Sequence, residues 1–247
     1  MLKYGRKIIQ YLFKKRQKCH GIRVVFASRS EADCDRSHIR MFEIGLSSEQ
    51  YGDYEQGTRA AAQTCEGERL IGISRTEGTF VPKEKWGLFG DRKRLPSGES
   101  VVYLNEDETV ITKVRNPFAK SIIKSLHAQD TIYEHLIHNI LFPSTRYNFI
   151  GISEDFDGIR IILQQKYLSN QYSTPTQSDI DDYLIQGLGL QIERRYYYAN
   201  DYIAITDVSA ESDNVLSDGS TLYFIDPIIK FKKPAIEVLD YYYSLLK

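Results

Sequence analysis

The sequence predicts an α+β fold of two lobes, in which an antiparallel sheet with one packed helix precedes a smaller, mostly helical lobe with a short hairpin. Three observations lead to this prediction. Residues 95–168 read in the order strand, strand, helix, strand, strand. A polar segment, residues 169–178, then interrupts the pattern, and residues 179–247 hold two helical patterns around two short apolar runs. The predicted parts are a mixed N-terminal extension, a sheet lobe and a reduced helical lobe: residues 1–84, 85–168 and 169–247.

The first hairpin and the helix of the predicted sheet lobe follow directly from the pattern. Residues 100–104 and 109–114 are apolar strands, and the acidic residues 105–108 form the turn between them. Pro117 ends this hairpin. Residues 119–142 then carry apolar side chains at helical spacing, which predicts a long helix.

A second strand pair completes the sheet lobe. Residues 147–152 and 158–165 are apolar runs on either side of a polar turn at residues 155–158. We therefore expect a four-stranded antiparallel sheet with one helix packed on it.

The second lobe is predicted from its helix ends. Ser178 or Asp179 is expected to cap a helix that runs through Leu188, where Gly187 and Gly189 mark the end. Pro234 suits the first turn of a final helix. The two short strands between these helices carry most of the polar residues considered below.

The N-terminal extension reads as mixed structure. Residues 1–18 form a basic amphipathic helix, residues 21–27 a strand and residues 47–62 a helix. A basic helix can contact phosphate or lipid, but docking on a neighbouring domain with a solvated charged face is the favoured interpretation. We expect residues 1–84 to pack against the sheet lobe.

Composition restricts partners and compartment. The 247 residues include 32 basic and 33 acidic side chains, so the net charge is -1 and gives no bulk attraction to nucleic acid or to an anionic membrane. No apolar run reaches the roughly twenty residues that a membrane-spanning helix needs. Cys19, Cys34 and Cys65 are widely spaced and odd in number, which predicts neither a disulfide framework nor a metal site. We therefore expect a reducing, cytoplasmic location and no nucleic-acid partner.

The strongest chemical signal lies near the C-terminus. Two short apolar runs each end at a carboxylate, Asp207 and Asp226, and Asn214 lies between them. Carboxylate and amide oxygens are ligands that a hard cation such as Mg²⁺ takes alongside substrate phosphates. The order Asp, Asn, Asp therefore predicts one base and two metal ligands at neighbouring strand ends.

A lysine in the first hairpin is the next candidate. Lys113 lies inside an apolar strand, where an ammonium group is costly to bury without a partner. Glu134, in the helix that follows, is a candidate partner that would fix the ammonium so that it can neutralise phosphate. The alternative is that strand alternation turns Lys113 to solvent and that Glu134 is an ordinary charge on the helix surface.

Two backbone segments are further candidates. In a turn before the first strand, small residues would allow backbone N–H groups to approach a phosphate. After the last strand of the sheet lobe, backbone groups could hydrogen-bond an adenine edge. In isolation, an ordinary turn and an ordinary strand end explain both segments as well. The residues concerned are Ser97, Gly98 and Ser100 in the first segment, and Gln165, Lys166 and Tyr167 in the second.

The joint order of these features resembles the protein-kinase-like superfamily. A small-residue turn, a strand lysine, a helix glutamate, a strand-to-linker hinge and then Asp, Asn and Asp follow at intervals suited to two lobes that close on a nucleotide. More narrowly, the sequence is similar to the compact kinase domains found in polyvalent proteins of phages and mobile bacterial elements. The resemblance covers residues 85–247, and the stretches that carry it are residues 97–103, 111–114 and 207–227.

The resemblance implies ATP and Mg²⁺ as cofactors and a role for each candidate residue. Lys113 would hold the α- and β-phosphates, and Glu134 would orient that lysine. Asp207 would orient or deprotonate the acceptor hydroxyl, while Asn214 and Asp226 would bind the metal. The backbone segments would cover the phosphates and contact adenine: Ser97, Gly98 and Ser100 for the phosphates, and Gln165, Lys166 and Tyr167 for the adenine.

The sequence also departs from the family pattern. Asn214 comes seven residues after Asp207, where the usual catalytic loop has an interval of five, so either the loop is longer or Asp213 takes over one role. No His-Arg pair precedes Asp207, and Pro227 stands where a glycine is common. The chain after Asp226 is too short for a usual activation segment and large helical lobe, which puts the docking of a protein substrate in doubt more than nucleotide binding.

Three hypotheses follow. The first is an ATP- and Mg²⁺-dependent phosphotransferase that moves the γ-phosphoryl group to a hydroxyl, with a protein as one candidate acceptor. The second is a catalytically inactive kinase-like module that binds nucleotide or serves as an interaction scaffold. The third is a non-enzymatic interaction protein that uses the basic N-terminal helix and the tyrosine-rich surfaces, although the near-neutral charge disfavours nucleic acid as its partner.

Overall fold

The chain divides into two compact units, each described here by itself. Within the computed structural model, no helix is both long enough and apolar enough to cross a membrane, for the residues that are described. These are residues 56–93, 100–119, 127–168 and 172–246. The predicted helix at residues 1–18, the strand at residues 21–27 and the start of the helix at residues 47–62 lie outside them. We call the described residues 56–136 and 146–167 the sheet unit, and 137–145 and 168–246 the C-terminal unit.

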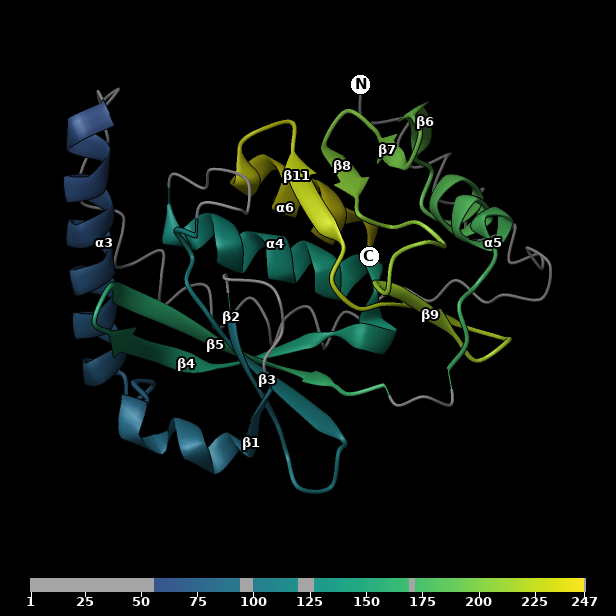
Figure 1. Cartoon of the computed structure of the whole chain (residues 1–247). Helices are drawn as coiled ribbons and strands as arrows, with labels where there is room; N and C mark the ends of the chain where they lie inside the picture. Colours follow the sequence, from purple (N-terminus) through teal and green to yellow (C-terminus); the bar gives the residue numbers. More distant parts are fainter. Residues whose placement is uncertain (1–55, 94–99, 120–126, 169–171, 247) are drawn as a thin grey trace. The chain divides into compact units, whose positions relative to one another are not determined.

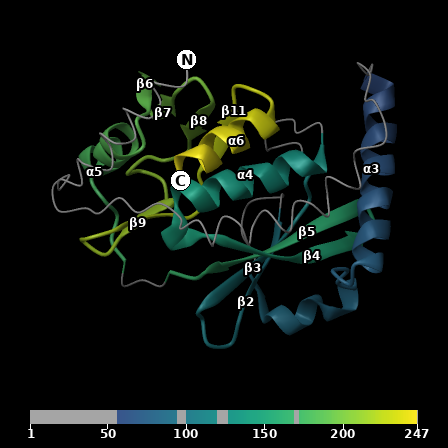
Figure 2. The ribbon, with the colours of Figure 1, turned by 180° about the vertical axis from the view of Figure 1, so that it is seen from behind.

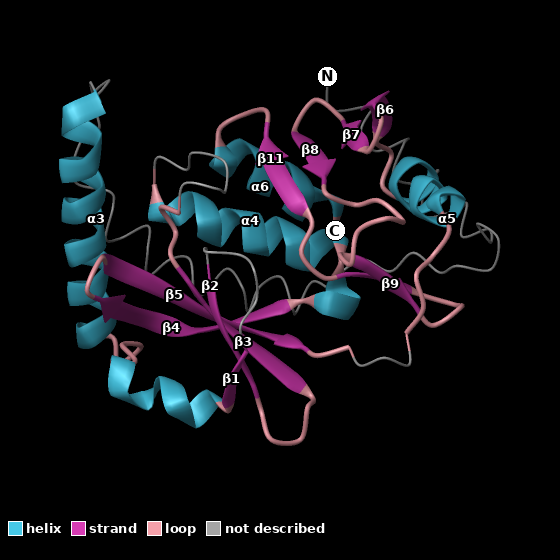
Figure 3. Ribbon diagram, viewed as in Figure 1, coloured by secondary structure: helices cyan, strands magenta, loops and turns pink. Residues whose placement is uncertain are grey.

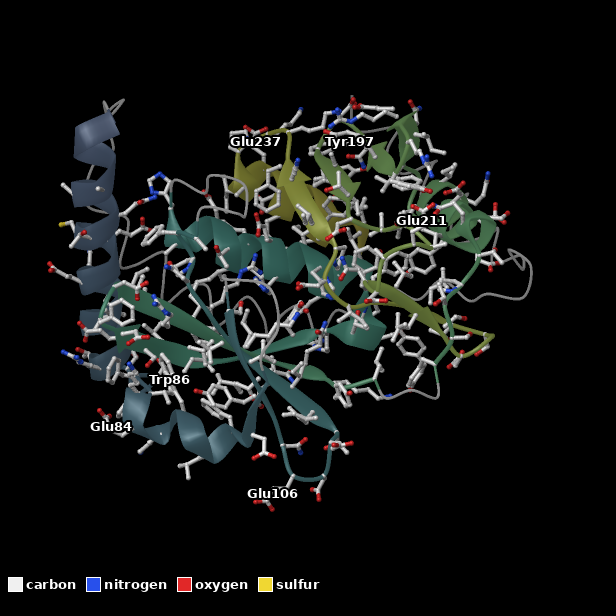
Figure 4. The ribbon with its side chains drawn as sticks, viewed as in Figure 1. Glu84, Trp86, Glu106, Tyr197, Glu211 and Glu237 are labelled. Atoms are coloured by element: carbon white, nitrogen blue, oxygen red, sulfur yellow. The ribbon has the colours of Figure 1, made fainter. Side chains whose placement is uncertain are left out.

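A five-stranded antiparallel sheet is the basis of the sheet unit (Figure 1). Its strand order is β1-β2-β3-β5-β4, and both predicted hairpins, β2-β3 and β4-β5, are confirmed. Glu106 lies at the tip of the first turn (Figure 4). Strand β1 was not expected from the sequence. The bounds are Asp91–Lys93 for β1, Ser100–Leu104 for β2, Val110–Arg115 for β3, Tyr147–Asp155 for β4 and Gly158–Lys166 for β5.

Side chains of β3 alternate between the two faces of this sheet, as the pleat requires. Val114 lies on one face, in a buried cluster with Trp86 and Ile162. Trp86 covers that face, and its indole N–H donates to Ser153 Oγ at 3.0 Å (Figure 4). Lys113, the next residue along β3, is therefore directed to the opposite face.

Helix α3 (Gln56–Thr76) packs against β4 and β5 (Figure 2). Leu70 is part of its buried face, and at Gly67 the helix comes so close to the sheet that an added Cβ would lie 3.3 Å from Ile159. The predicted helix over residues 47–62 ends too early. Glycines lower helix propensity in this stretch, whereas packing against the sheet sustains the helix. The described part of the extension thus packs on the sheet through α3. The 3-10 helix η1 (Lys83–Phe89) begins at its end and contributes Trp86 to the buried cluster on the sheet.

Helix α4 (Ala128–Leu141) begins later than the predicted helix over residues 119–142. The side chain of Asn116 accepts a local backbone N–H and makes a turn instead of a helix start. The N–H of Ala128, the first helical residue, is accepted by the buried carboxylate of Glu66 at 2.9 Å. Because this cap comes from a distant helix, apolar periodicity could not locate the start.

The C-terminal unit is rich in strands, where the sequence predicts a mostly helical lobe (Figure 3). It contains a four-stranded sheet of order β11-β8-β7-β6 and the separate hairpin β9-β10. Strands β6 and β7 were not predicted, because they are short and β6 is exposed along its whole length, so no alternation in polarity marks it. The strands are β6 (Gln191–Arg194), β7 (Tyr197–Ala199), β8 (Ile203–Thr206), β9 (Val215–Ser217), β10 (Leu222–Phe224) and β11 (Ile228–Phe231).

The first helix of the C-terminal unit, α5 (Gln177–Asp182), is capped by Thr176 and not by Ser178 or Asp179. The Thr176 hydroxyl accepts the N–H of Asp179 at 3.2 Å, and the Asp179 carboxylate accepts the N–H of Thr176 at 3.1 Å. This reciprocal pair is a capping box. The chain continues into the π-helical turn η3 (Tyr183–Gly187), while the final helix, α6 (Ala235–Leu245), follows Pro234 as predicted.

An aromatic cluster fixes β10 in the core of the C-terminal unit. Phe142 stacks on Phe224 with 4.4 Å between ring centroids, and Tyr183 packs on Phe224 at 4.9 Å. The hydroxyl of Thr145, in the 3-10 helix η2 (Pro143–Thr145), donates to the carbonyl of Phe224 at 2.6 Å. The end of β10, which leads to Asp226, is thereby held by both packing and hydrogen bonding.

Candidate active site

Asp207 lies directly after β8, in a backbone conformation that residues other than glycine seldom adopt. Its φ is 62°, in the left-handed region, and its side chain is exposed. Aspartate and asparagine tolerate this region better than other residues with a Cβ. Such conformations occur often at functional sites, where the surrounding structure has to hold them.

Asn214 holds the carboxylate of Asp207. Its Nδ2 donates to Asp207 Oδ2 at 2.7 Å and to the Asp207 carbonyl at 3.2 Å. The two residues therefore meet despite the longer interval in sequence, and the extra residues form a turn in which the N–H of Ser212 donates to the carbonyl of Ser209. Because Nδ2 is used in this way, Asn214 Oδ1 is the atom that could ligate a cation.

Asp226 is tied to the same loop through the backbone. The N–H of its neighbour Ile225 donates to the carbonyl of Asn214 at 2.8 Å. This bond extends the β9-β10 hairpin and brings the chain at Asp226 beside the chain at Asn214. The Asp226 side chain is exposed at the end of the hairpin. All three predicted oxygen-bearing residues thus lie in one loop region of the C-terminal unit.

The middle of that loop is held by Gln177, which the sequence analysis missed. Its Oε1 accepts the N–H of Ala210 at 3.0 Å, and its Nε2 donates to the Tyr198 hydroxyl at 2.8 Å and to Asp181 Oδ1 at 2.9 Å. Burial and the neighbouring Asp181 carboxylate raise the pKa of Tyr198, whose hydroxyl donates to Asp181 at 2.5 Å. No local sequence pattern predicts this hydrogen-bond network, because its members come from separate elements.

Replacing Gln177 with methionine should loosen the loop without changing the volume of the side chain greatly. The N–H of Ala210 would lose its acceptor, and we expect a loss of about 1–3 kcal/mol in the free energy of unfolding. Urea denaturation measures this loss, and hydrogen exchange at Ala210 locates it. Gln186→Met, at an exposed position on the same helical segment, is the control and should change stability by less than about 0.5 kcal/mol. Equal stability of the two variants would contradict the role given to Gln177.

Lys113 is buried in the sheet unit. It is 8% exposed, its Nζ donates to the Tyr147 hydroxyl at 2.9 Å and lies 5.1 Å from the centre of the Tyr147 ring. The alternative in which Lys113 faces solvent is therefore wrong. Glu134 lies on α4 and is half-buried, and the pairing of Lys113 with Glu134 stays a prediction. Tyr147 was missed by the sequence analysis, since nothing in the start of a strand marks it as a lysine partner.

His135 connects α4 to the same region of the sheet. Its ring packs edge-on against Tyr147, with 4.6 Å between centroids, and its Nε2 lies 3.2 Å from Arg115 Nη1. Arginine only donates, so Nε2 accepts and Nδ1 carries the proton that it donates to the carbonyl of Thr131. The histidine thus anchors the middle of α4 to β3 and β4.

The backbone of the predicted hinge is partly hydrogen-bonded within the sheet. The backbone N–H of Tyr167 donates to the carbonyl of Thr109 at 2.9 Å, so this donor is already used. In an antiparallel ladder, alternate residues direct their N–H and C=O to opposite sides. Since Tyr167 and Gln165 point toward β3, the backbone groups of Lys166 point to the other side, where β4 begins. Contact between residues 165–167 and a base stays a prediction.

The predicted phosphate-covering turn is only partly within the described residues. Ser97 and Gly98 lie outside them, and Ser100 opens β2 opposite Arg115. The candidate residues are distributed over both units. Lys113, Glu134, Ser100 and Gln165, Lys166 and Tyr167 belong to the sheet unit, and Asp207, Asn214 and Asp226 belong to the C-terminal unit.

Comparison with known proteins gives one match. The model of a family described as serine/threonine/tyrosine kinase found in polyvalent proteins matches residues 63–233, more than two thirds of the 247 residues. The match begins within α3, so it includes part of the segment that the sequence analysis left as an extension. No curated protein and no solved structure matches the chain.

Proposed function

The chain belongs to the family of serine/threonine/tyrosine kinases found in polyvalent proteins, and from this premise we propose that it transfers the γ-phosphoryl group of magnesium-bound ATP to a hydroxyl group. The hydrogen bond between Asn214 and Asp207 is the observation that carries the proposal. It places a candidate base beside a candidate metal ligand, and phosphoryl transfer uses a residue of each kind. The family description favours the hydroxyl of a serine, threonine or tyrosine side chain as the acceptor.

The residues present are chemically suited to magnesium. Asn214 Oδ1 and the Asp226 carboxylate are hard oxygen donors, and two protein ligands leave the remaining positions to phosphate and water, as Mg²⁺ prefers. When bound, the metal would neutralise charge on the phosphate oxygens. Two observations support a magnesium site: the type and number of these oxygen donors, and the backbone hydrogen bond from Ile225 to Asn214 that joins their chain segments.

The chain's own residues would contribute positioning and charge. Asp207 would accept a hydrogen bond from the acceptor hydroxyl and take its proton as the new ester bond forms, while the bond from the γ-phosphorus to the bridging oxygen breaks and ADP leaves. Asn214 would keep the Asp207 carboxylate in one orientation, and Lys113 would bind phosphate oxygens with its ammonium group. Positioning and electrostatic stabilisation account for most of the rate acceleration in phosphoryl transfer, so a small set of polar residues is sufficient.

The inactive module remains the second candidate. The seven-residue interval between Asp207 and Asn214 and the presence of Pro227 favour it. The longer interval does not separate the two residues, because the loop closes and their side chains make contact.

Thermal unfolding with and without ATP and Mg²⁺ tests nucleotide binding. A ligand at a hundred times its Kd stabilises the folded state by about 2.7 kcal/mol, so the wild-type melting temperature should rise. Asp226→Asn should lose most of that rise, whereas Asp240→Asn, at an exposed position on α6, should keep it. A wild type that gains nothing from ATP and Mg²⁺ would refute the proposal. Binding without transfer of labelled γ-phosphate to serine, threonine or tyrosine peptides would establish the inactive module instead.

A further inference from the structure

Helix α3 reaches α4 through one buried carboxylate. Glu66 is 2% exposed, and its Oε1 accepts the N–H of Ala128 at 2.9 Å. Its Oε2 lies 3.4 Å from His127 Nδ1. A carboxylate is costly to bury unless it is paired and hydrogen-bonded, and a helix N-terminus offers both unpaired N–H groups and partial positive charge. Glu66 is therefore a cap for α4 that comes from another helix.

Contacts with the sheet fix the position of α3, the helix that carries Glu66. Gly67, the residue after Glu66, packs closely against Ile159 of β5. Further along α3, Arg75 Nη2 donates to Glu154 of β4 at 2.9 Å. The carboxylate of Glu66 thus projects from a helix that contacts the sheet at Gly67 and again at Arg75.

The capped helix carries Glu134, the predicted partner of Lys113. Glu134 lies six residues beyond Ala128, which corresponds to about 9 Å along a helix axis. In the middle of the helix, His135 contacts Arg115 and Tyr147. A helix held at its first turn and again at its middle has a defined direction, so loss of the cap should let the first turn fray and the glutamate shift.

We infer that Glu66 is a positioning residue, through which α3 fixes the first turn of α4 and hence Glu134, and that His127 makes this hold depend on pH. The inference rests on the proposed function in so far as Glu134 serves phosphoryl transfer. The contact by which Glu66 of α3 caps α4 is independent of that function.

The direction of the pH dependence follows from His127. Its hydrogen bond with Glu66 raises the pKa above the ordinary value of 6.5, while burial opposes this shift and the charges of Glu66 and Asp130 add to it. The charged groups that act on His127 include Glu66 from α3 and Asp130 from α4. A raised pKa in the folded state gives a stabilisation that is complete below the unfolded-state pKa and is lost as the pH rises through the folded-state pKa. The hold on α4 should therefore weaken as the pH rises above 6.5.

Hydrogen exchange on the full chain can distinguish the effect of the Glu66 acceptor oxygen from the effect of its negative charge. Glu66→Ala removes both and should lower the protection factor of the Ala128 amide roughly tenfold. Glu66→Gln keeps an acceptor oxygen, so it should keep most of the protection but lose the pH dependence between pH values below and above 6.5. Glu68→Ala, at an exposed position on the same helix, is the control and should match wild type at every pH.

Steady-state kinetics provide a second measurement. If Glu66 served only the stability of the fold, kcat would not differ between Glu66→Ala and Glu66→Gln. Glu66→Ala should lower kcat for phosphoryl transfer roughly tenfold, because the displaced Glu134 would no longer orient Lys113, and Glu66→Gln should restore most of it. Unchanged protection at Ala128 in Glu66→Ala, or an unchanged pH dependence in Glu66→Gln, would overturn the inference. Reduced protection with wild-type kcat would overturn the positioning of Glu134 while leaving the proposed function intact. Absence of transfer in the wild type itself would instead refute the proposed function.

Discussion

Replacement of Asp207 with asparagine is expected to reduce phosphoryl transfer by roughly 10²–10⁴-fold, the range for removal of a general base. Asparagine has nearly the same size, tolerates the left-handed backbone at this position and can still accept a hydrogen bond from Asn214. The fold should therefore be retained, and the melting temperature with ATP and Mg²⁺ should rise as in the wild type. Initial rates with labelled ATP measure the loss.

Asp213→Asn distinguishes between the two carboxylates of the loop. Asp213 is exposed and adjacent to Asn214, so it could take the base role if the longer loop displaced Asp207. We expect this variant to retain transfer, because the contact that Asn214 makes is with Asp207. Loss of transfer in Asp213→Asn together with activity in Asp207→Asn would move the base to Asp213.

The parts of the fold that were predictable are those in which local sequence decides the structure. The strands of the two hairpins are short apolar runs joined by turns that contain aspartate, and both of these signals act over a few residues. The start of α4 was not predictable, because its cap is supplied by Glu66 from another helix. The strand β6 was missed because all of its side chains are exposed, so burial leaves no period-two pattern in the sequence.

The candidate site divides in the same way. Residue type and order were sufficient to single out Asp207, Asn214 and Asp226, because hard cations and proton transfer require oxygen-bearing side chains. The supporting residues could not be found in this manner. Gln177 and Tyr147 act through contacts with residues distant in sequence, and such contacts have no spacing rule. The hydrogen bond from the N–H of Tyr167 to Thr109 likewise depends on strand register. Register is set by the pairing of the whole sheet and not by a local sequence pattern.

Replacement of Lys113 with methionine is expected to lower phosphoryl transfer by roughly 10²–10³-fold, the usual effect of removing one group that stabilises transition-state charge. Methionine approximates the shape of lysine, and exchanging a buried charge for an apolar side chain of similar volume is often neutral for stability or stabilising. The variant should therefore unfold at nearly the wild-type denaturant concentration while its rate falls. This combination separates a functional ammonium from a structural one.

The control for Lys113→Met is Lys85→Met, at an exposed position on η1 of the same unit, which should leave both rate and stability unchanged. Tyr147→Phe adds a second comparison, because it removes the hydroxyl that accepts a hydrogen bond from Lys113 but keeps the ring beneath the ammonium. If Lys113 binds phosphate, Tyr147→Phe should cost far less activity than Lys113→Met, since the charge remains. A wild-type rate in Lys113→Met accompanied by a large loss of stability would mean that the lysine serves the fold of the sheet unit and not the nucleotide.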